Sequence, residues 1–129
     1  MITAFGLMLD RCGLSQREAA SLLGVRLDTI KGWGIGRSAV PHGALQEMRR
    51  LYACQRRAAS EALDVIAKHH LAQDVIELSM SADDYEAQQL GWPCCGAHGA
   101  VLGMVIADTD AAIRIVPRGS TAATAAAEI

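Results

Sequence analysis

The side chains with the clearest chemical potential lie close together late in the chain: Cys94, Cys95 and His98, with His69 and His70 upstream. Thiolates and imidazoles are ligands that zinc prefers, but structural zinc sites separate paired cysteines by two to four residues, and these two are adjacent. A Cys–His nucleophile would need a third group to orient it and a cleft, and the sequence indicates neither. We therefore expect no metal, no cofactor and no catalytic residue. The thiols are interpreted as small apolar fillers, and His98 as a capping or solvent-facing side chain.

A second group of polar side chains lies in residues 14–41, where the spacing predicts two short helices joined by a tight turn. An S-x-x-E capping box opens the first helix, and Gly24 ends it because a left-handed residue is least strained as glycine. Ile30 and Trp33 give the second helix, 26–33, an inward face. Alanines on the first helix allow a close, steep crossing. This is the geometry of a helix-turn-helix, whose second helix can enter a major groove.

The pattern S-Q-x-x-A-A-x-L-L-G-V-x-x-x-T-I-x-x-W-x-x-G-R resembles the helix-turn-helix of the Cro/C1-type (XRE) phage repressors and antitoxins, over about residues 5–51. Two positions depart from the family pattern. Gly34 stands where many relatives have glutamate, and Gly32 occupies a recognition-helix position that is usually polar. One base contact is therefore expected to be missing or made by the backbone. The exit G-R-S-A-V-P is similar to that of the anti-CRISPR-associated repressors of phages, which implies autoregulation of a phage operon.

The resemblance implies a set of residues that contact DNA. It places the first turn of the first helix against a phosphate, side chains of the second helix at base edges, and the following loop on the sugar–phosphate backbone. In this chain these positions are Gln16, Arg17, Arg26, Leu27, Asp28, Thr29, Lys31, Arg37 and Ser38. Arginine can pair with guanine, Asp28 can accept from cytosine, and Leu27 can touch a thymine methyl group. Alternatively, these are solvent-facing residues of a short helix; this alternative is strongest for Asp28, whose carboxylate needs a partner near phosphates.

The net charge of −2 hides an asymmetry along the chain. Residues 1–57 hold nine Lys or Arg against four Asp or Glu, a formal +5, whereas residues 58–129 hold three against ten, a formal −7. A basic front and an acidic rear suit a protein that meets phosphates with one end, although small domains also show such splits by chance. The motif, more than the charge, favours DNA binding.

Composition indicates where the protein works. The chain of 129 residues is 51% hydrophobic but has only five aromatic residues, so its core must be built from Ala, Leu, Val and Ile. No run approaches the ~20 apolar residues of a membrane span, and no secretory signal is evident at the N-terminus. The four cysteines are then expected to be reduced. These observations predict a cytoplasmic, nucleoid-associated protein.

The remaining elements predict a mainly α fold with a small α+β C-terminal part. A helix is expected at about 3–12, and a long connector helix from Pro41 to His69 that could break near 58–60. A strand, two helices and a closing strand should follow, at 74–80, 83–90 (with Ser81 or Asp83 as its cap), 96–107 and 112–116. The domains are then an N-terminal helix-turn-helix bundle (1–57), a connector and strand-helix-helix-strand dimer unit (58–118), and a flexible tail (119–129). Two strands make a marginal sheet. Pairing with the strands of a second copy would extend the sheet, which favours a homodimer.

These expectations combine into a dimeric DNA-binding regulator, a repressor of its own phage or mobile-element operon that reads a palindromic operator. The first alternative is an antitoxin that binds a toxin, as its protein partner, through the C-terminal half and autoregulates its operon. The second is a ligand-responsive sensor or small enzyme that uses residues 74–118. The third is a degenerate module in which Gly32 and Gly34 have abolished DNA binding.

Overall fold

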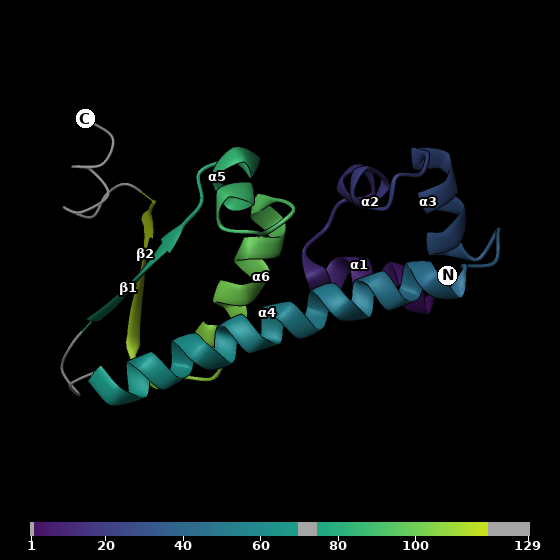
Figure 1. Ribbon diagram of the computed structural model, residues 1–129. Coiled ribbons are helices and arrows are strands. Elements are labelled where there is room, and N and C mark those ends of the chain that lie inside the picture. Colours follow the sequence, from purple (N-terminus) through teal and green to yellow (C-terminus); the bar gives the residue numbers. More distant parts are fainter. Residues whose placement is uncertain (1, 70–74, 119–129) are drawn as a thin grey trace.

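The computed structural model describes residues 2–69 and 75–118 of this chain. It is mainly helical, with a small sheet near the C-terminus (Figure 1). The helices and strands, in chain order, are α1 (Ala4–Cys12), α2 (Gln16–Leu23), α3 (Leu27–Ile35), α4 (His42–His69), β1 (Val75–Met80), α5 (Asp84–Gln89), α6 (Cys95–Ala107) and β2 (Ala112–Pro117). The predicted order of elements is confirmed, and the expected tail 119–129 lies outside the described residues.

Capping residues set the ends of the first helices. Ser15 accepts a hydrogen bond from the Glu18 N–H, and the Glu18 carboxylate accepts one from the Ser15 N–H, so the predicted capping box is present. Gly24 ends α2 in the left-handed region, at φ 68°. Thr3 caps α1, and its hydroxyl also donates to the Trp33 carbonyl at 2.7 Å. That bond ties the start of α1 to the last turn of α3, which extends beyond its predicted end.

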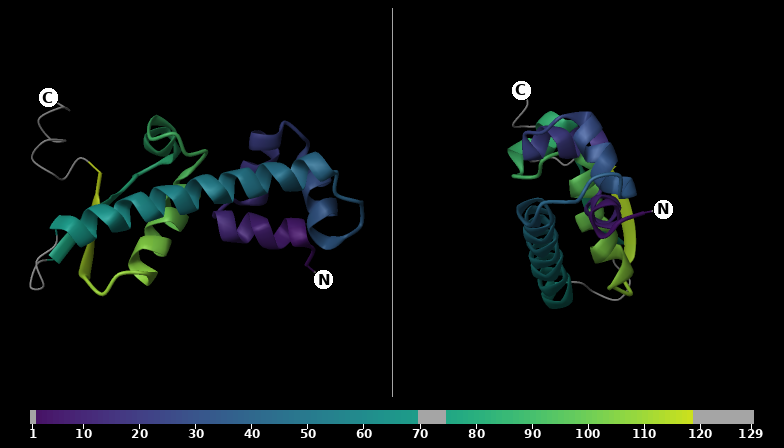
Figure 2. Two further views of the ribbon diagram at one scale, coloured as in Figure 1. Left: turned by 60° about the horizontal axis from the view of Figure 1, so that its bottom comes forward. Right: turned by 90° about the vertical axis from the view of Figure 1, so that its right-hand side faces the viewer.

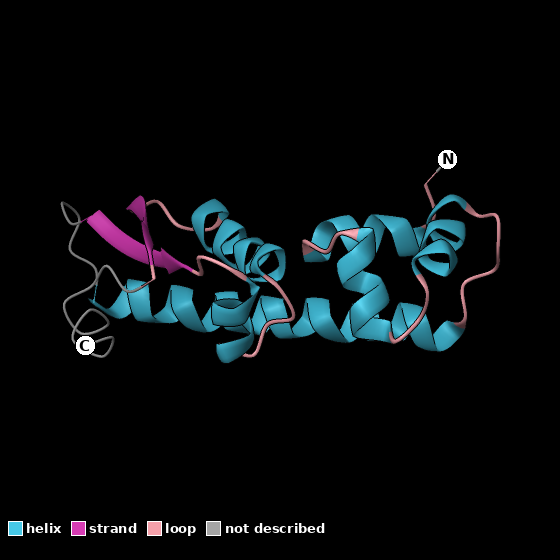
Figure 3. Cartoon of the chain, turned by 90° about the horizontal axis from the view of Figure 1, so that it is seen from above, coloured by secondary structure: helices cyan, strands magenta, loops and turns pink. Residues whose placement is uncertain are grey.

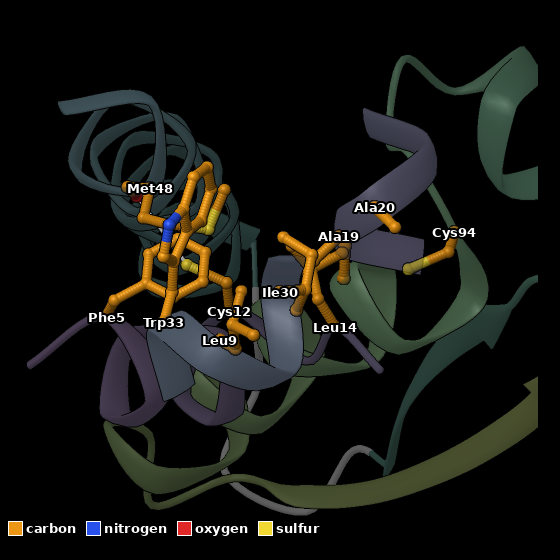
Figure 4. Close-up of a cluster of buried hydrophobic side chains, with 11 residues drawn as sticks. Phe5, Leu9, Cys12, Leu14, Ala19, Ala20, Ile30, Trp33, Met48 and Cys94 are labelled. Atoms are coloured by element: carbon orange, nitrogen blue, oxygen red, sulfur yellow. Dashed lines mark hydrogen bonds between the residues drawn. The ribbon is translucent and has the colours of Figure 1, made fainter. Parts of the chain in front are cut away.

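The main core lies between α1, α2, α3 and the first half of α4 (Figure 4). Phe5 and Trp33 meet edge to face with ring centroids 5.4 Å apart, a geometry that aromatic quadrupoles favour. Ile30 and Met48 are fully buried beside them. The prediction that Ile30 and Trp33 face the core is therefore confirmed.

Helix α4 runs unbroken for 28 residues, roughly 40 Å, and lies along both groups of smaller elements (Figure 2). The break suggested near 58–60 is absent. Ala59 is instead buried in a second hydrophobic cluster with Val101 and Val105 of α6. Because this part of α4 packs on another helix and contains no glycine or proline, nothing interrupts it. None of the helices in the described residues is long and apolar enough to cross a membrane.

The sheet consists of β1 and β2, paired in parallel with Val75 opposite Ala112 and Met80 opposite Pro117. A parallel pair requires a long crossover, which α5 and α6 provide (Figure 3). Leu78 of β1 packs against the cluster on α6. On the solvent side Arg114 and Glu77 form an ion pair at 2.9 Å. The sheet thus lies at the end of the molecule opposite α3 (Figures 1 and 3).

Two contacts hold the start of α6 against the helical end of the molecule. Gly13, at the end of α1, and Gly96, in α6, touch backbone to backbone; a Cβ on Gly96 would lie 2.0 Å from the Gly13 carbonyl oxygen. Fully buried Gln55 of α4 donates to the carbonyls of Cys12, at 2.9 Å, and Ala97, at 3.1 Å. One side chain therefore joins α1, α4 and α6.

Candidate nucleic-acid interface

Helix α3 lies at one end of the molecule, and α2 lies beside it on the side toward α6 (Figure 1). Its hydrophobic side, Ile30 and Trp33, is buried, so the remaining side chains must point outward. The predicted residues that are exposed are Gln16, Arg17, Arg26, Asp28, Lys31, Arg37 and Ser38, while Leu27 and Thr29 are half-buried. Arg26 precedes the first turn of α3 rather than lying within it.

The left-handed Gly36, at φ 85°, ends α3 and turns the chain back over it. Ser38 N–H then donates to the Gly32 carbonyl at 3.3 Å. Arg37 crosses the same part of the helix, and its Nη2 donates to the Asp28 backbone oxygen at 3.2 Å and lies 3.3 Å from the Asp28 carboxylate. The partner that the Asp28 carboxylate requires is therefore Arg37, from the loop.

Gly32 is buried beneath this crossing. A Cβ at Gly32 would lie 3.2 Å from both Arg37 Nη2 and Ser38 Oγ, tighter than ordinary contact. Side chains of Arg37 and Ser38 therefore cover the outer face at this position. That a base contact here is missing or made by the backbone stays a prediction. The absence of a side chain makes room for the Arg37 guanidinium, which occupies the face where Gly32 and Asp28 lie one helical turn apart.

The first turn of α2 contributes two residues that face different hollows. Gln16 lines a hollow with Gly34 and Ile35 at the end of α3. Arg17 lines another, between α2 and α5, together with Asp84. The structure therefore places Gln16 at the end of α3. Arg17 instead lines a hollow beside α5.

The Cys95 thiol and the His98 imidazole lie together at the start of α6, apart from the candidate interface. His98 Nδ1 accepts the Ser81 N–H at 3.2 Å and lies 2.9 Å from the Ser81 hydroxyl, and Cys95 Sγ donates to the Ser81 carbonyl at 3.4 Å. Burial, with a smaller contribution from the positive charge of Arg118, lowers the pKa of His98. His98 thus does not face solvent as expected, because α6 packs this side chain against the loop after β1. Asp83, not Ser81, caps α5.

Cys94 behaves as the predicted apolar filler. Its side chain is 1% exposed within the main core, and burial raises its pKa to about 11. A thiol in that state is protonated and is a poor nucleophile and metal ligand. Within residues 2–69 and 75–118, no three His, Cys, Asp or Glu side chains gather closely enough to hold a metal ion.

Sequence patterns alone missed two arrangements. Gln55 lies within the polar run R-R-L-Y-A-C-Q-R-R, which has the composition of a solvated helix face, so no local signal marks it as buried. The Arg37–Asp28 pair had a usable signal. The glycine at position 32 lies one turn after Asp28, and glycine on an outer helix face is often explained by another group crossing it.

Comparison with known proteins adds no family to this description. No protein-family model matches the chain, and no curated protein matches it.

Proposed function

We propose that this chain is a sequence-specific DNA-binding regulator, a repressor of its own operon in a phage or mobile element, which binds a palindromic operator as a homodimer. The observation that supports this proposal best is the outer face of α3. It carries Arg26, Lys31 and Arg37 around a helix whose other side is anchored in the core. An exposed helix with cations at its start, middle and exit fits the width and charge of a major groove.

In the proposed complex, Arg37 donates the hydrogen bond that a polar side chain at position 32 would otherwise donate. Its guanidinium has five donors in a rigid fork. Within the part of the chain that the structure describes, its two contacts are both to Asp28. The remaining donors are available for a guanine edge or a phosphate. The Arg37 side chain is 54% exposed, so DNA can reach it without unfolding of the loop.

The ion pair with Arg37 also limits the repulsion between the Asp28 carboxylate and DNA. An isolated Asp28 would repel the phosphates that flank the groove. Paired with Arg37, it contributes little net charge, and Arg26 and Lys31 keep the face positive. Asp28 then orients the guanidinium of Arg37 and retains an oxygen for cytosine N4.

The test is fluorescence anisotropy with labelled duplexes from the DNA upstream of the gene, over a salt series. Arg37→Ala is expected to weaken specific binding about 5- to 150-fold, the equivalent of ~1–3 kcal/mol for one bidentate contact. Lys31→Ala should weaken all duplexes alike and reduce the slope of log K against log salt by about one per protomer. The matched control is Arg114→Ala, an exposed, ion-paired arginine on β2, which should leave affinity unchanged.

Folding of these variants can be separated from binding. The exposed Arg37–Asp28 pair is worth ~0.2–1 kcal/mol, so the thermal unfolding of Arg37→Ala should stay close to that of the wild type. If wild-type protein binds no upstream duplex at low salt, the proposed function is refuted. If Arg37→Ala binds as tightly as wild type, the assignment of Arg37 fails.

A further inference from the structure

Helix α6 has an unusual composition for its position. Between Cys95 and Ala107 it contains no charged residue. Its inner side, Val101 and Val105, is buried against α4, but its outer side, which includes Gly103 and Ala107, is open to solvent. A helix that is apolar on all sides is normally covered on all sides, so the open side calls for a partner.

The open side of α6 forms one wall of a continuous groove along α4. Three adjoining hollows of about 450, 290 and 590 Å³ make up this groove, because the first two share Tyr52 and Met104 and the last two share Leu63 and Asp108. Along α4 it extends from Tyr52 to Ala67, about 22 Å. Figure 2, left, views the side on which α1 and α6 both emerge beneath α4. We call this hollow the α4–α6 groove.

Charged residues are distributed unevenly along the α4–α6 groove. One of its two arginines lies at the α1 end, and most of its aspartates lie toward the loop that precedes β2. Arg11, beside Asp10, lies at the first end, and Asp64 and Asp110 lie at the second. Arg56 and Asp108 both line the middle hollow. Such a pattern is self-complementary: a two-fold axis near the midpoint brings the arginines of each copy to the aspartates of the other.

The wall of the groove that α6 forms also suits close approach of a second α6. Ala100, Gly103 and Ala107 of α6 line it, at spacings of three and four that keep them on one side of a helix. Small residues at such spacing let two helix backbones come close. We propose that the occupant of the α4–α6 groove is a second copy of this chain, so that the dimer forms through α4 and α6 rather than through the edges of the sheet.

This inference rests on the homodimer in the proposed function and specifies its interface. The test is sedimentation velocity of the full chain, without DNA, over a concentration series. Gly103→Glu is the main variant, because a Cβ at Gly103 meets no atom within 4 Å and so leaves the fold of one copy undisturbed. It should weaken dimerisation by on the order of 100-fold or more, since the added side chain would fill the space that the second α6 occupies and would carry a charge into the interface. Gly103→Arg should have the same effect if the carboxylate variant folds poorly.

Two controls make the result specific. Gly43→Glu places the same charge at another open glycine, on α4 outside the groove, and should remain dimeric like the wild type. Ile115→Glu alters an exposed large hydrophobic residue of β2 and should also remain dimeric. A wild type that stays monomeric, a dimeric Gly103→Glu, or an Ile115→Glu that alone becomes monomeric would each overturn the interface. A wild-type dimer that binds no DNA would refute the proposed function and leave this interface standing.

Discussion

Replacement of Gln55 tests whether one buried amide joins the two ends of the molecule. Gln55→Leu keeps the volume but removes the hydrogen bonds to the Cys12 and Ala97 carbonyls. Each is worth ~0.5–1.5 kcal/mol net. The Cys12 carbonyl, left without this donor, costs a further ~1–3 kcal/mol. In the wild type, Gln55 Oε1 is itself buried without a partner among the described residues, so its removal stabilises the variant by a similar amount. The net loss is therefore about 2 kcal/mol, or roughly 8 °C in Tm for a chain of this size.

The assay is urea unfolding followed by circular dichroism, with two comparison variants. Gln46→Leu changes another glutamine of α4, at the surface, and should shift stability by less than ~0.5 kcal/mol. Gln55→Glu should be worse than Gln55→Leu at neutral pH, because an ionised carboxylate facing two carbonyl oxygens has no donor. Its folded-state pKa would be raised, so the deficit should shrink as the pH falls. A Gln55→Leu protein as stable as the wild type would refute the bridging role.

Two other predictions concern the elements around α6. Gly96→Ala would put a Cβ 2.0 Å from a backbone oxygen of the α1–α2 turn and should cost ~1–3 kcal/mol in urea unfolding. Gly43→Ala, at an open position of α4 outside the groove, should be neutral or stabilising by up to ~1 kcal/mol. Equal effects of the two substitutions would contradict the close contact at Gly96. Burial lowers the pKa of His98, so the unfolded state binds more protons below about pH 6.5. The free energy of unfolding should therefore be greatest above that pH and should fall on acidification. His98→Asn should make the free energy of unfolding depend less on pH. If the variant has the same pH dependence as the wild type, His98 does not cause it.

Local signals in the sequence were sufficient for most of the secondary structure. The capping box at Ser15 and the left-handed glycine at Gly24 fix both ends of α2 because each acts within one helical turn. The apolar pair Ile30 and Trp33 likewise identified the buried side of α3. The exception was the suggested break in α4 near 58–60, where burial of that stretch against α6 decides the outcome, and α6 is distant in the sequence.

The hydrophobic periodicity of a sequence does not predict contacts between residues that are distant in the chain. Nothing near Gly13 indicates that Gly96 will lie against it, because two glycines in contact leave no pattern in either segment. The direction of pairing between β1 and β2 was also open, since the connection through α5 and α6 is long enough for either direction. His98 was misplaced for the same reason: its partner, Ser81, lies in the loop before α5.

The candidate interface shows how a departure from a family pattern can hold information. Considered alone, Gly32 removes a side chain from the outer face of α3, and Asp28 adds a negative charge to it. The geometry links the two, because the guanidinium of Arg37 crosses the glycine to reach the aspartate. A side chain at position 32 would displace the guanidinium from this crossing, and a neutral side chain at position 28 would leave Arg37 its bond to the backbone oxygen but no carboxylate. In the proposed complex these three positions therefore act as one unit, and base preference should depend on them jointly rather than on each residue separately.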